Sequence, residues 1–237
     1  MVVRRLLLGL LLVCQAAVAQ SGDPHADFTR ELTAIREEAY VTPRAALRRL
    51  DVLRQGHTGR ELGQVLVVTS GAYWWLKDMN RAVDAAVGAE RLGRELHDDD
   101  LLAQAMLHHA YALSKYVHDQ EAARRLVQGA ARLADDTADP YLKTEALVTQ
   151  GMLAEEDGDT PGGIELVTRA VDVARAGDDP DALQMALREQ ARLLAGVGKF
   201  TEALARTDEM IAAARARGIP GQLAHARLAE YATAARA

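Results

Sequence analysis

The stretch "DPYLKTEALVTQGMLAEEDGDTPGGIELVTRAVDVARAGDDP" (residues 139–180) decides the fold. It begins and ends with Asp-Pro, so that Pro140 and Pro180 stand forty residues apart. Aspartate before proline is typical of a helix start, because the carboxylate caps free backbone N–H groups and proline tolerates the first helical turn. The turn signal "DGD" (157–159) divides the stretch in two. It therefore predicts one unit made of two helices.

The forty-residue spacing continues on both sides of this unit. Pro220 comes forty residues after Pro180, Asp98-Asp99-Asp100 ends at position 100, and position 60 follows "GHTG". Helices are thus expected to begin near residues 60, 100, 140, 180 and 220, and a fixed period of this length indicates a repeat architecture. About twenty-two residues after the first four starts, small residues open a second helix: Ala82, Ala122, Gly163 and Ala203.

A shorter helix pair is expected ahead of the first full repeat. In "FTRELTAIREEAY" (28–40) the apolar residues fall on one helical face. "TPRAALRRLDVLRQ" (42–55) then opens with Thr42 as the cap and Pro43 in the first turn. The predicted pairs lie near residues 26–56, 60–97, 100–136, 140–176 and 180–217, with a terminal helix at 220–235.

The first nineteen residues have the three-part layout of a secretory signal peptide. Arg4 and Arg5 precede an apolar run from Leu6 to Val13, and Ala17-Val18-Ala19 supplies the small-residue cleavage pattern. Cleavage after Ala19 would leave residues 20–237 as the mature helical repeat domain. An uncleaved membrane anchor is the weaker alternative, because the apolar run is short for a bilayer.

Cys14 is the single cysteine of the chain and lies inside this segment. A lipid on Cys14 is a minor alternative, because Val13 replaces the small residue that precedes the cysteine of a lipoprotein signal. Removal of residues 1–19 would take away two of the 28 basic residues and no acid, leaving 26 against 34 and a net charge of −8. This charge argues against nucleic acid and anionic lipid as partners. We expect a soluble protein, periplasmic or secreted, with no membrane contact after cleavage.

No convergent set of catalytic or metal-binding residues is visible in the sequence. His108 and His109 are adjacent, and neighbours on a helix diverge by about 100°, so the two imidazoles do not face one metal ion. The acids Asp98, Asp99 and Asp100 lie at an expected helix start, where carboxylates stabilise the helix dipole. The sequence therefore predicts no enzymatic activity, no metal and no cofactor.

The repeats resemble the tetratricopeptide repeat. In the third full unit Gly151, Gly163 and Ala170 take the family's small-residue positions, and "GKFTEAL" (198–204) is similar to the family's turn. The period of forty exceeds the family's thirty-four, and aliphatic residues replace the family's tryptophan: Leu66, Met106, Leu147 and Leu187. The resemblance implies a right-handed, all-α solenoid of antiparallel helix pairs.

The same resemblance implies a binding surface for a peptide or protein partner. In the family the first helix of each pair lines a concave groove, and its groove positions can be carried over onto this sequence. The predicted partner-binding residues are Gln64, Val67, Trp74, Trp75, Gln104, Leu107, Tyr111, Lys115, Glu145, Met152, Glu155, Arg188 and Arg192.

The two tryptophans of the chain stand side by side in "GAYWWLKD" (71–78). Two interpretations are open. In one, one ring is half-buried against a neighbouring helix and the other faces the groove. In the other, both pack against the N-terminal helices, since large aromatic side chains are usually mostly buried.

The sequence thus favours an exported, non-enzymatic scaffold that binds a peptide or protein in its groove. An alternative comes from a second resemblance. An exported start, then "EEAYVTPRAALRRLDVL" (37–53), then long helical repeats is similar to the periplasmic sensor region of bacterial diguanylate cyclases. That resemblance implies a ligand-sensing input module of a signalling protein, without its membrane and catalytic parts. Partner identity and oligomeric state stay open.

Overall fold

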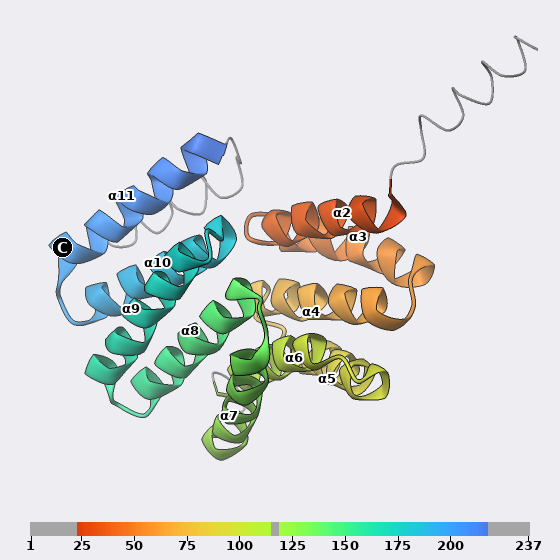
Figure 1. The fold of residues 1–237 in the computed structure, drawn as a ribbon, viewed down its shortest axis with the longest axis horizontal. Helices are drawn as coiled ribbons and strands as arrows, with labels where there is room; N and C mark the ends of the chain where they lie inside the picture. The colour runs from red at the N-terminus through yellow and green to blue at the C-terminus, as the bar shows by residue number, and fades with distance from the viewer. Residues whose placement is uncertain (1–22, 115–118, 218–237) are drawn as a thin grey trace, which may run out of the picture.

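Helices make up nearly all of the chain that this computed structural model describes, which is residues 23–114 and 119–217 (Figure 1). No strand occurs in these residues, so the predicted all-α fold class is confirmed. The predicted signal peptide, Lys115 and the terminal helix at 220–235 lie outside the described residues. The helices are α2 (Pro24–Ala39), α3 (Pro43–Gly56), α4 (Gly59–Trp75), α5 (Met79–Leu96), α6 (Asp99–Ala112), α7 (Gln120–Asp136), α8 (Pro140–Glu156), α9 (Thr160–Ala176), α10 (Pro180–Gly196) and α11 (Phe200–Arg217).

The helices stack as successive pairs. Each helix packs on the next one along the chain, and the first members of the pairs also contact each other: α2 with α4, α4 with α6, α6 with α8, and α8 with α10. These five helices form the inner layer, while α7, α9 and α11 lie further out (Figure 1). A solenoid of this kind is held together mainly by contacts between neighbouring units.

Aspartate caps fix the start of most inner helices. The Asp139 carboxylate accepts a hydrogen bond from the backbone N–H of Tyr141 at 2.9 Å, and α8 begins at Pro140. Asp179 and Pro180 play the same parts in α10. Asp98 caps α6, which agrees with a capping role for the acidic run. Thr42 precedes α3 but makes no side-chain cap, so the prediction of a threonine cap is wrong there.

Small residues allow the two helices of a pair to touch. A methyl group on Gly163 of α9 would lie 2.7 Å from the carbonyl oxygen of Gly151 in α8, closer than carbon and oxygen approach without strain. In the first full unit the Ser70 hydroxyl donates a hydrogen bond across the pair to the carbonyl oxygen of Ala82, at 2.8 Å. The small residues at these repeat positions are therefore required by close backbone approach.

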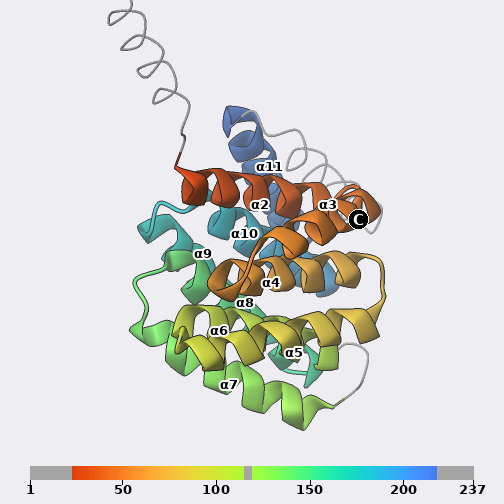
Figure 2. The same cartoon turned by 90° about the vertical axis from the view of Figure 1, so that its right-hand side faces the viewer.

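The N-terminal pair has a hydrophobic core of its own, shared with α4. Its buried residues come from α2, α3 and α4 and include Phe28, Ile35, Leu50 and Val68. This core fixes α2 against α4. It contains no residue of α8 or α10, although α2 runs close to α10 in both views of the fold (Figure 1 and Figure 2).

Candidate functional site

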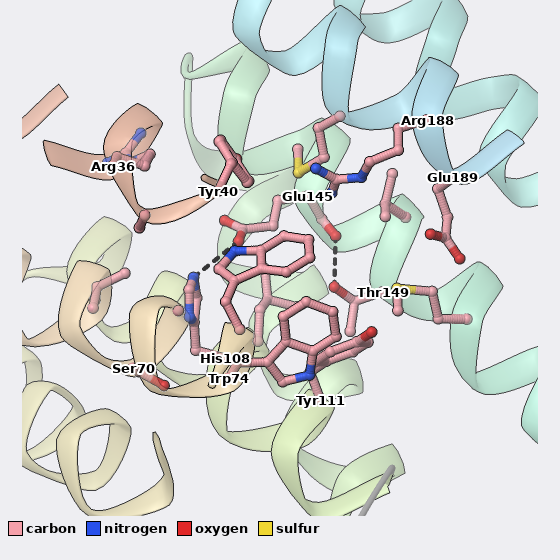
Figure 3. Close-up of a pocket in the computed structure, with 18 of the residues that line it drawn as sticks. Arg36, Tyr40, Ser70, Trp74, His108, Tyr111, Glu145, Thr149, Arg188 and Glu189 are labelled. Carbon is pink, nitrogen blue, oxygen red and sulfur yellow. Dashed lines mark hydrogen bonds and ion pairs between the residues drawn. The ribbon is translucent and has the colours of Figure 1, made fainter. Parts of the chain in front are cut away.

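A cavity of about 430 Å³ lies among the inner helices, and α2, α4, α6, α8 and α10 all contribute to its wall (Figure 3). The wall is mostly apolar, with a small number of charged and polar side chains. Pockets that bind small molecules or short segments typically have volumes of about 300–1,000 Å³ and this composition. The cavity is therefore the candidate binding site.

The first helix of the chain bounds this cavity on one side. The guanidinium of Arg36 in α2 lies over the ring of Tyr141 in α8, 5.3 Å from its centroid. The guanidinium of Arg188 in α10 lies over the ring of Tyr40, the residue that caps α2, at 5.7 Å. The concave face is thus narrowed to a pocket here, where the sequence predicted a concave groove. The rotation from unit to unit brings the N-terminal pair round to the fourth and fifth pairs.

Four aromatic rings form a continuous array along the pocket. The ring centroids of Tyr40 and Trp75 are 5.4 Å apart, those of Trp75 and Trp74 are 4.4 Å apart, and those of Trp74 and Tyr111 are 5.0 Å apart. The first two pairs are edge-to-face and the third is tilted, which are favourable arrangements for aromatic rings. The array spans α2, α4 and α6 and offers a rigid apolar surface to a ligand.

The two tryptophans pack on different cores. Trp75 lies against the N-terminal core, and Trp74 lies against a separate cluster that contains Met79, Ala82 and Ala112. Both are half-buried and both line the pocket. Neither interpretation of the "WW" pair describes this arrangement fully. Side chains that diverge by 100° reach the same pocket because it is wide enough to receive both.

Arg192 is neutralised by two acids at one end of the pocket. Its Nε donates to Glu189 at 2.7 Å, and its Nη1 donates to Glu155 at 2.9 Å. Burial disfavours the charged guanidinium, but the two carboxylates outweigh burial and raise the pKa of Arg192 above its ordinary value. Arg192 is therefore held as part of an ion-pair network within the wall.

Glu145 carries an unpartnered oxygen at the pocket. This residue is only 8 % exposed, and its Oε1 lies 3.3 Å from Nε2 of His108. Its Oε2, like the indole Nε1 of Trp74, is buried and has no hydrogen-bond partner among the described residues. A buried polar atom without a partner costs roughly 1–3 kcal/mol. Two such atoms in one wall favour a ligand, or a rotation of these side chains, that would satisfy them.

Most of the residues predicted for the binding surface meet at this pocket. Gln64 does not line it, because the pocket lies at the other end of α4. Glu155 does not line the pocket, but it accepts a hydrogen bond from Arg192, which does. Lys115 is outside the described residues. Their contact with a partner stays a prediction. The predicted residues that line the pocket are Val67, Trp74, Trp75, Gln104, Leu107, Tyr111, Glu145, Met152, Arg188 and Arg192.

Several pocket residues were not predicted: Arg36, Tyr40, His108, Tyr141 and Glu189. Arg36 and Tyr40 come from the N-terminal pair, to which the groove positions were not carried over. Their spacing of four residues, which places both on one side of α2, was the available signal. Tyr141 is half-buried where α2 meets α8, and its partial removal from solvent raises the pKa of its hydroxyl.

The adjacent histidines point to different carboxylates, as their 100° divergence requires. His108 approaches Glu145, whereas Nδ1 of His109 lies 2.6 Å from Oε1 of Glu90. In residues 23–114 and 119–217 no group of three histidine, cysteine or acidic side chains could hold a metal ion. Within the same ranges no helix is long and apolar enough to cross a membrane.

Comparison with solved structures reveals similar folds at low sequence identity. A Rap protein complexed with competence and sporulation factor has a TM-score of 0.61 and 17% identity over 78% of this chain and 51% of that one. The fold is that of a tetratricopeptide-like α-solenoid. Aspartyl phosphate phosphatase F from Bacillus subtilis has a TM-score of 0.56 and 18% identity, over 73% of this chain and 45% of that one. The apo form of RapI has a TM-score of 0.51 and 11% identity, over 95% and 64%.

This chain spans about half the length of the first two of these proteins. No family model and no curated protein matches the sequence.

Proposed function

We propose that this protein is a non-enzymatic scaffold that binds a short segment of a peptide or protein partner in the central pocket. The observation that carries the proposal is the ring array of Tyr40, Trp75, Trp74 and Tyr111, which lines a cavity formed by all five inner helices. Rigid aromatic rings are common anchors of binding surfaces, because they contribute a large contact area and lose little conformational entropy.

The two aliphatic hydroxyl groups of the pocket, those of Ser70 and Thr149, support a binding role over a catalytic one. The Ser70 hydroxyl donates to the carbonyl oxygen of Ala82, and the Thr149 hydroxyl donates to the carbonyl oxygen of Glu145, each at 2.8 Å (Figure 3 shows the second bond). Neither is bonded to a side-chain base that could activate it as a nucleophile. One protein of similar fold is named a phosphatase, and another is in complex with a factor. We propose that this chain, like the protein in complex with a factor, binds a partner.

A selection experiment tests the proposal. A phage-displayed library of random pentapeptides would be panned on the immobilised chain from residue 20 onward and on its Trp74→Ala variant. Loss of a true anchor costs roughly 2 kcal/mol, so we expect Trp74→Ala to raise the Kd of a selected peptide roughly thirtyfold. Tyr73→Ala is the matched control, because Tyr73 is the neighbouring aromatic residue and does not line the pocket. Equal affinity of wild type and folded Trp74→Ala would contradict the proposal.

The closure of the pocket by α2 favours a second candidate, the ligand-sensing input module. A cavity of about 430 Å³ with a partly enclosed wall also suits a small organic molecule. In this case a library of small metabolites would contain compounds that raise the melting temperature of wild type and not of Trp74→Ala. Saturable binding of a small molecule, with no peptide recovered from panning, would favour this candidate over the first.

We further propose that either role is carried out after export, in the periplasm or outside the cell. The support is the layout of residues 1–19, with two arginines, an apolar run and a small-residue cleavage pattern.

A further inference from the structure

The three arginines of the pocket differ in how far their charge is compensated. Arg192 is paired with Glu155 and Glu189. Burial alone would lower the pKa of Arg36, but neighbouring acidic groups, led by Tyr141, raise it. Among the described residues no carboxylate lies at ion-pair distance from Arg188, whereas Arg192 has two such partners.

The geometry of Arg188 leaves its donors available to a ligand. Its guanidinium lies over two aromatic rings, 5.7 Å from the centroid of Tyr40 and 6.0 Å from that of Trp75. Cation–π attraction needs no hydrogen bond from the guanidinium, so its N–H groups can still donate to the two oxygens of a carboxylate. The structure records no hydrogen bond from these N–H groups to the described residues.

The charge balance of this part of the pocket also favours an anion. Among the residues that line the cavity, once Arg192 and its two acids are set aside, Arg36 and Arg188 stand against the carboxylate of Glu145, an excess of one positive charge. Asp181, a further acid near Arg36, is itself paired with Arg217. The whole chain has 34 acidic against 28 basic residues, so this local excess runs against the overall charge. An anionic group in a partly enclosed pocket is attracted more strongly than at an open surface, because solvent screens it less.

Arg188 stands at one end of the ring array. An anion on its guanidinium would therefore lie beside Trp75, whose ring contacts Trp74, which in turn contacts Tyr111. Figure 3 shows Arg188, Trp74 and Tyr111 around the same pocket. The pocket thus places a positive charge on α10 next to an apolar surface formed by α4 and α6.

We infer that the bound segment is acidic: it presents a carboxylate to Arg188 and, next to it, an aromatic or long aliphatic side chain to the rings of Trp74, Trp75 and Tyr111. This inference rests on the proposed function, since it names the chemistry of the partner segment for the same pocket. Glu145 disfavours a second acid on the α8 side, so the carboxylate has one preferred position.

The test extends the pentapeptide selection to variants of Arg188. The library is panned in parallel on wild type, Arg188→Gln, Arg188→Lys and the control Arg91→Gln, whose arginine is exposed on α5 and outside the pocket. Wild type and Arg91→Gln should enrich peptides with Asp or Glu within two positions of an aromatic or long aliphatic residue. Arg188→Gln should keep the apolar preference and lose the acidic one, and Arg188→Lys should retain the acidic one with weaker binding.

Titration of one selected peptide gives the quantitative result. Replacing its acid by the amide, Glu→Gln or Asp→Asn, should weaken binding to wild type about tenfold or more and leave binding to Arg188→Gln unchanged. Circular dichroism checks that each variant is folded. If Arg188→Gln does not fold, the inference is tested by the peptides that Arg188→Lys enriches and by the affinity of the amide peptide for wild type.

The possible outcomes distinguish a failure of the inference from a failure of the proposed function on which it rests. Peptides that depend on Trp74 but show no preference for acids, or whose preference survives Arg188→Gln, would overturn the inference and leave the proposed function standing. Enrichment of basic peptides would do the same. If panning yields no peptide whose binding depends on the pocket, both the inference and the proposed function are contradicted.

Discussion

The guanidinium of Arg188 lies over the ring of Tyr40, and this contact joins the fifth helix pair to the first. A second contact of the same kind, between Arg36 and Tyr141, lies beside it. The N-terminal core contains residues of α2, α3 and α4 only. Cation–π pairs contribute about 0.5–2 kcal/mol each, so the closure is weaker than the packing along the solenoid.

We therefore predict that Tyr40→Ala loosens the first helix without unfolding the protein. Removal of the ring takes away its contacts with Arg188 and Trp75, and the free energy of local opening of α2 should fall by about 1–2 kcal/mol. Hydrogen exchange of the amides in α2 would be faster, while exchange in α8 and α9 would be unchanged. Tyr40→Phe is the control, since it keeps the ring. Unaltered exchange in α2 of Tyr40→Ala would show that the ring does not hold the closure.

The close approach of α8 and α9 gives a prediction about glycine. Gly163→Ala should destabilise the protein by about 1–3 kcal/mol, because the new methyl group meets the carbonyl oxygen of Gly151 at 2.7 Å. Gly196→Ala is the matched control: an added methyl group there meets nothing within 4 Å, and alanine favours the helix. Urea denaturation followed by circular dichroism measures both. A Gly163→Ala variant as stable as wild type would mean that the two helices can separate at no cost.

Stability in acid should depend on Glu90. This carboxyl is 4 % exposed, and burial would raise its pKa, but hydrogen bonds from His109 and Arg94 outweigh burial and lower it below the ordinary value of 4.5. A depressed pKa in the folded state contributes stability that is complete above about pH 4.5 and is lost as the pH falls below that value.

The test compares Glu90→Gln with wild type at pH 7 and at pH 4. Wild type should lose more of its urea midpoint between the two pH values than Glu90→Gln does, because the amide cannot titrate. Glu95→Gln on the same helix is the control, since Glu95 is exposed and pairs only loosely with Arg91, at 3.8 Å. An identical acid response of wild type and Glu90→Gln would mean that the carboxylate contributes nothing to pH-dependent stability.

Export can be tested by the mass of the mature protein. Expressed in a bacterial host, the exported chain should begin at Gln20 and carry no lipid. Ala19→Leu should block cleavage because a small residue is needed directly before the cleaved bond, whereas Val18→Leu should be processed normally. Intact mass spectrometry distinguishes the forms. A diacylglyceryl group on Cys14 would contradict the prediction.

The helix starts were predictable because they depend on local interactions. The carboxylates of Asp139 and Asp179 bond to backbone N–H groups two or three positions further on, so the Asp-Pro pairs suffice to locate α8 and α10. The small residues at 151 and 163 were also informative, because each repeat has the same need for close approach at the same position. Thr42 is the exception, since a similar local pattern makes no cap there.

The lining of the candidate site was predictable only in part. Groove positions such as Trp74, Tyr111 and Arg188 follow from their place within a repeat, and they do line the pocket. Arg36 and Tyr141 could not be placed together in this way. They lie in different repeats, and their contact depends on the relative rotation of every pair between them.

The sequence by itself determined which segments are helical, where the inner helices begin and, for the full repeats, which residues face the concave side, since all of these depend on interactions within one unit or between neighbours. Only the tertiary structure decided that α2 meets α8 and α10, that the groove becomes a pocket, and that Arg188 lies over aromatic rings with no carboxylate partner among residues 23–114 and 119–217. The physical reason is that small rotations at each interface accumulate along a solenoid. Contacts between its ends therefore follow from the sum of all the interfaces and from no single one of them.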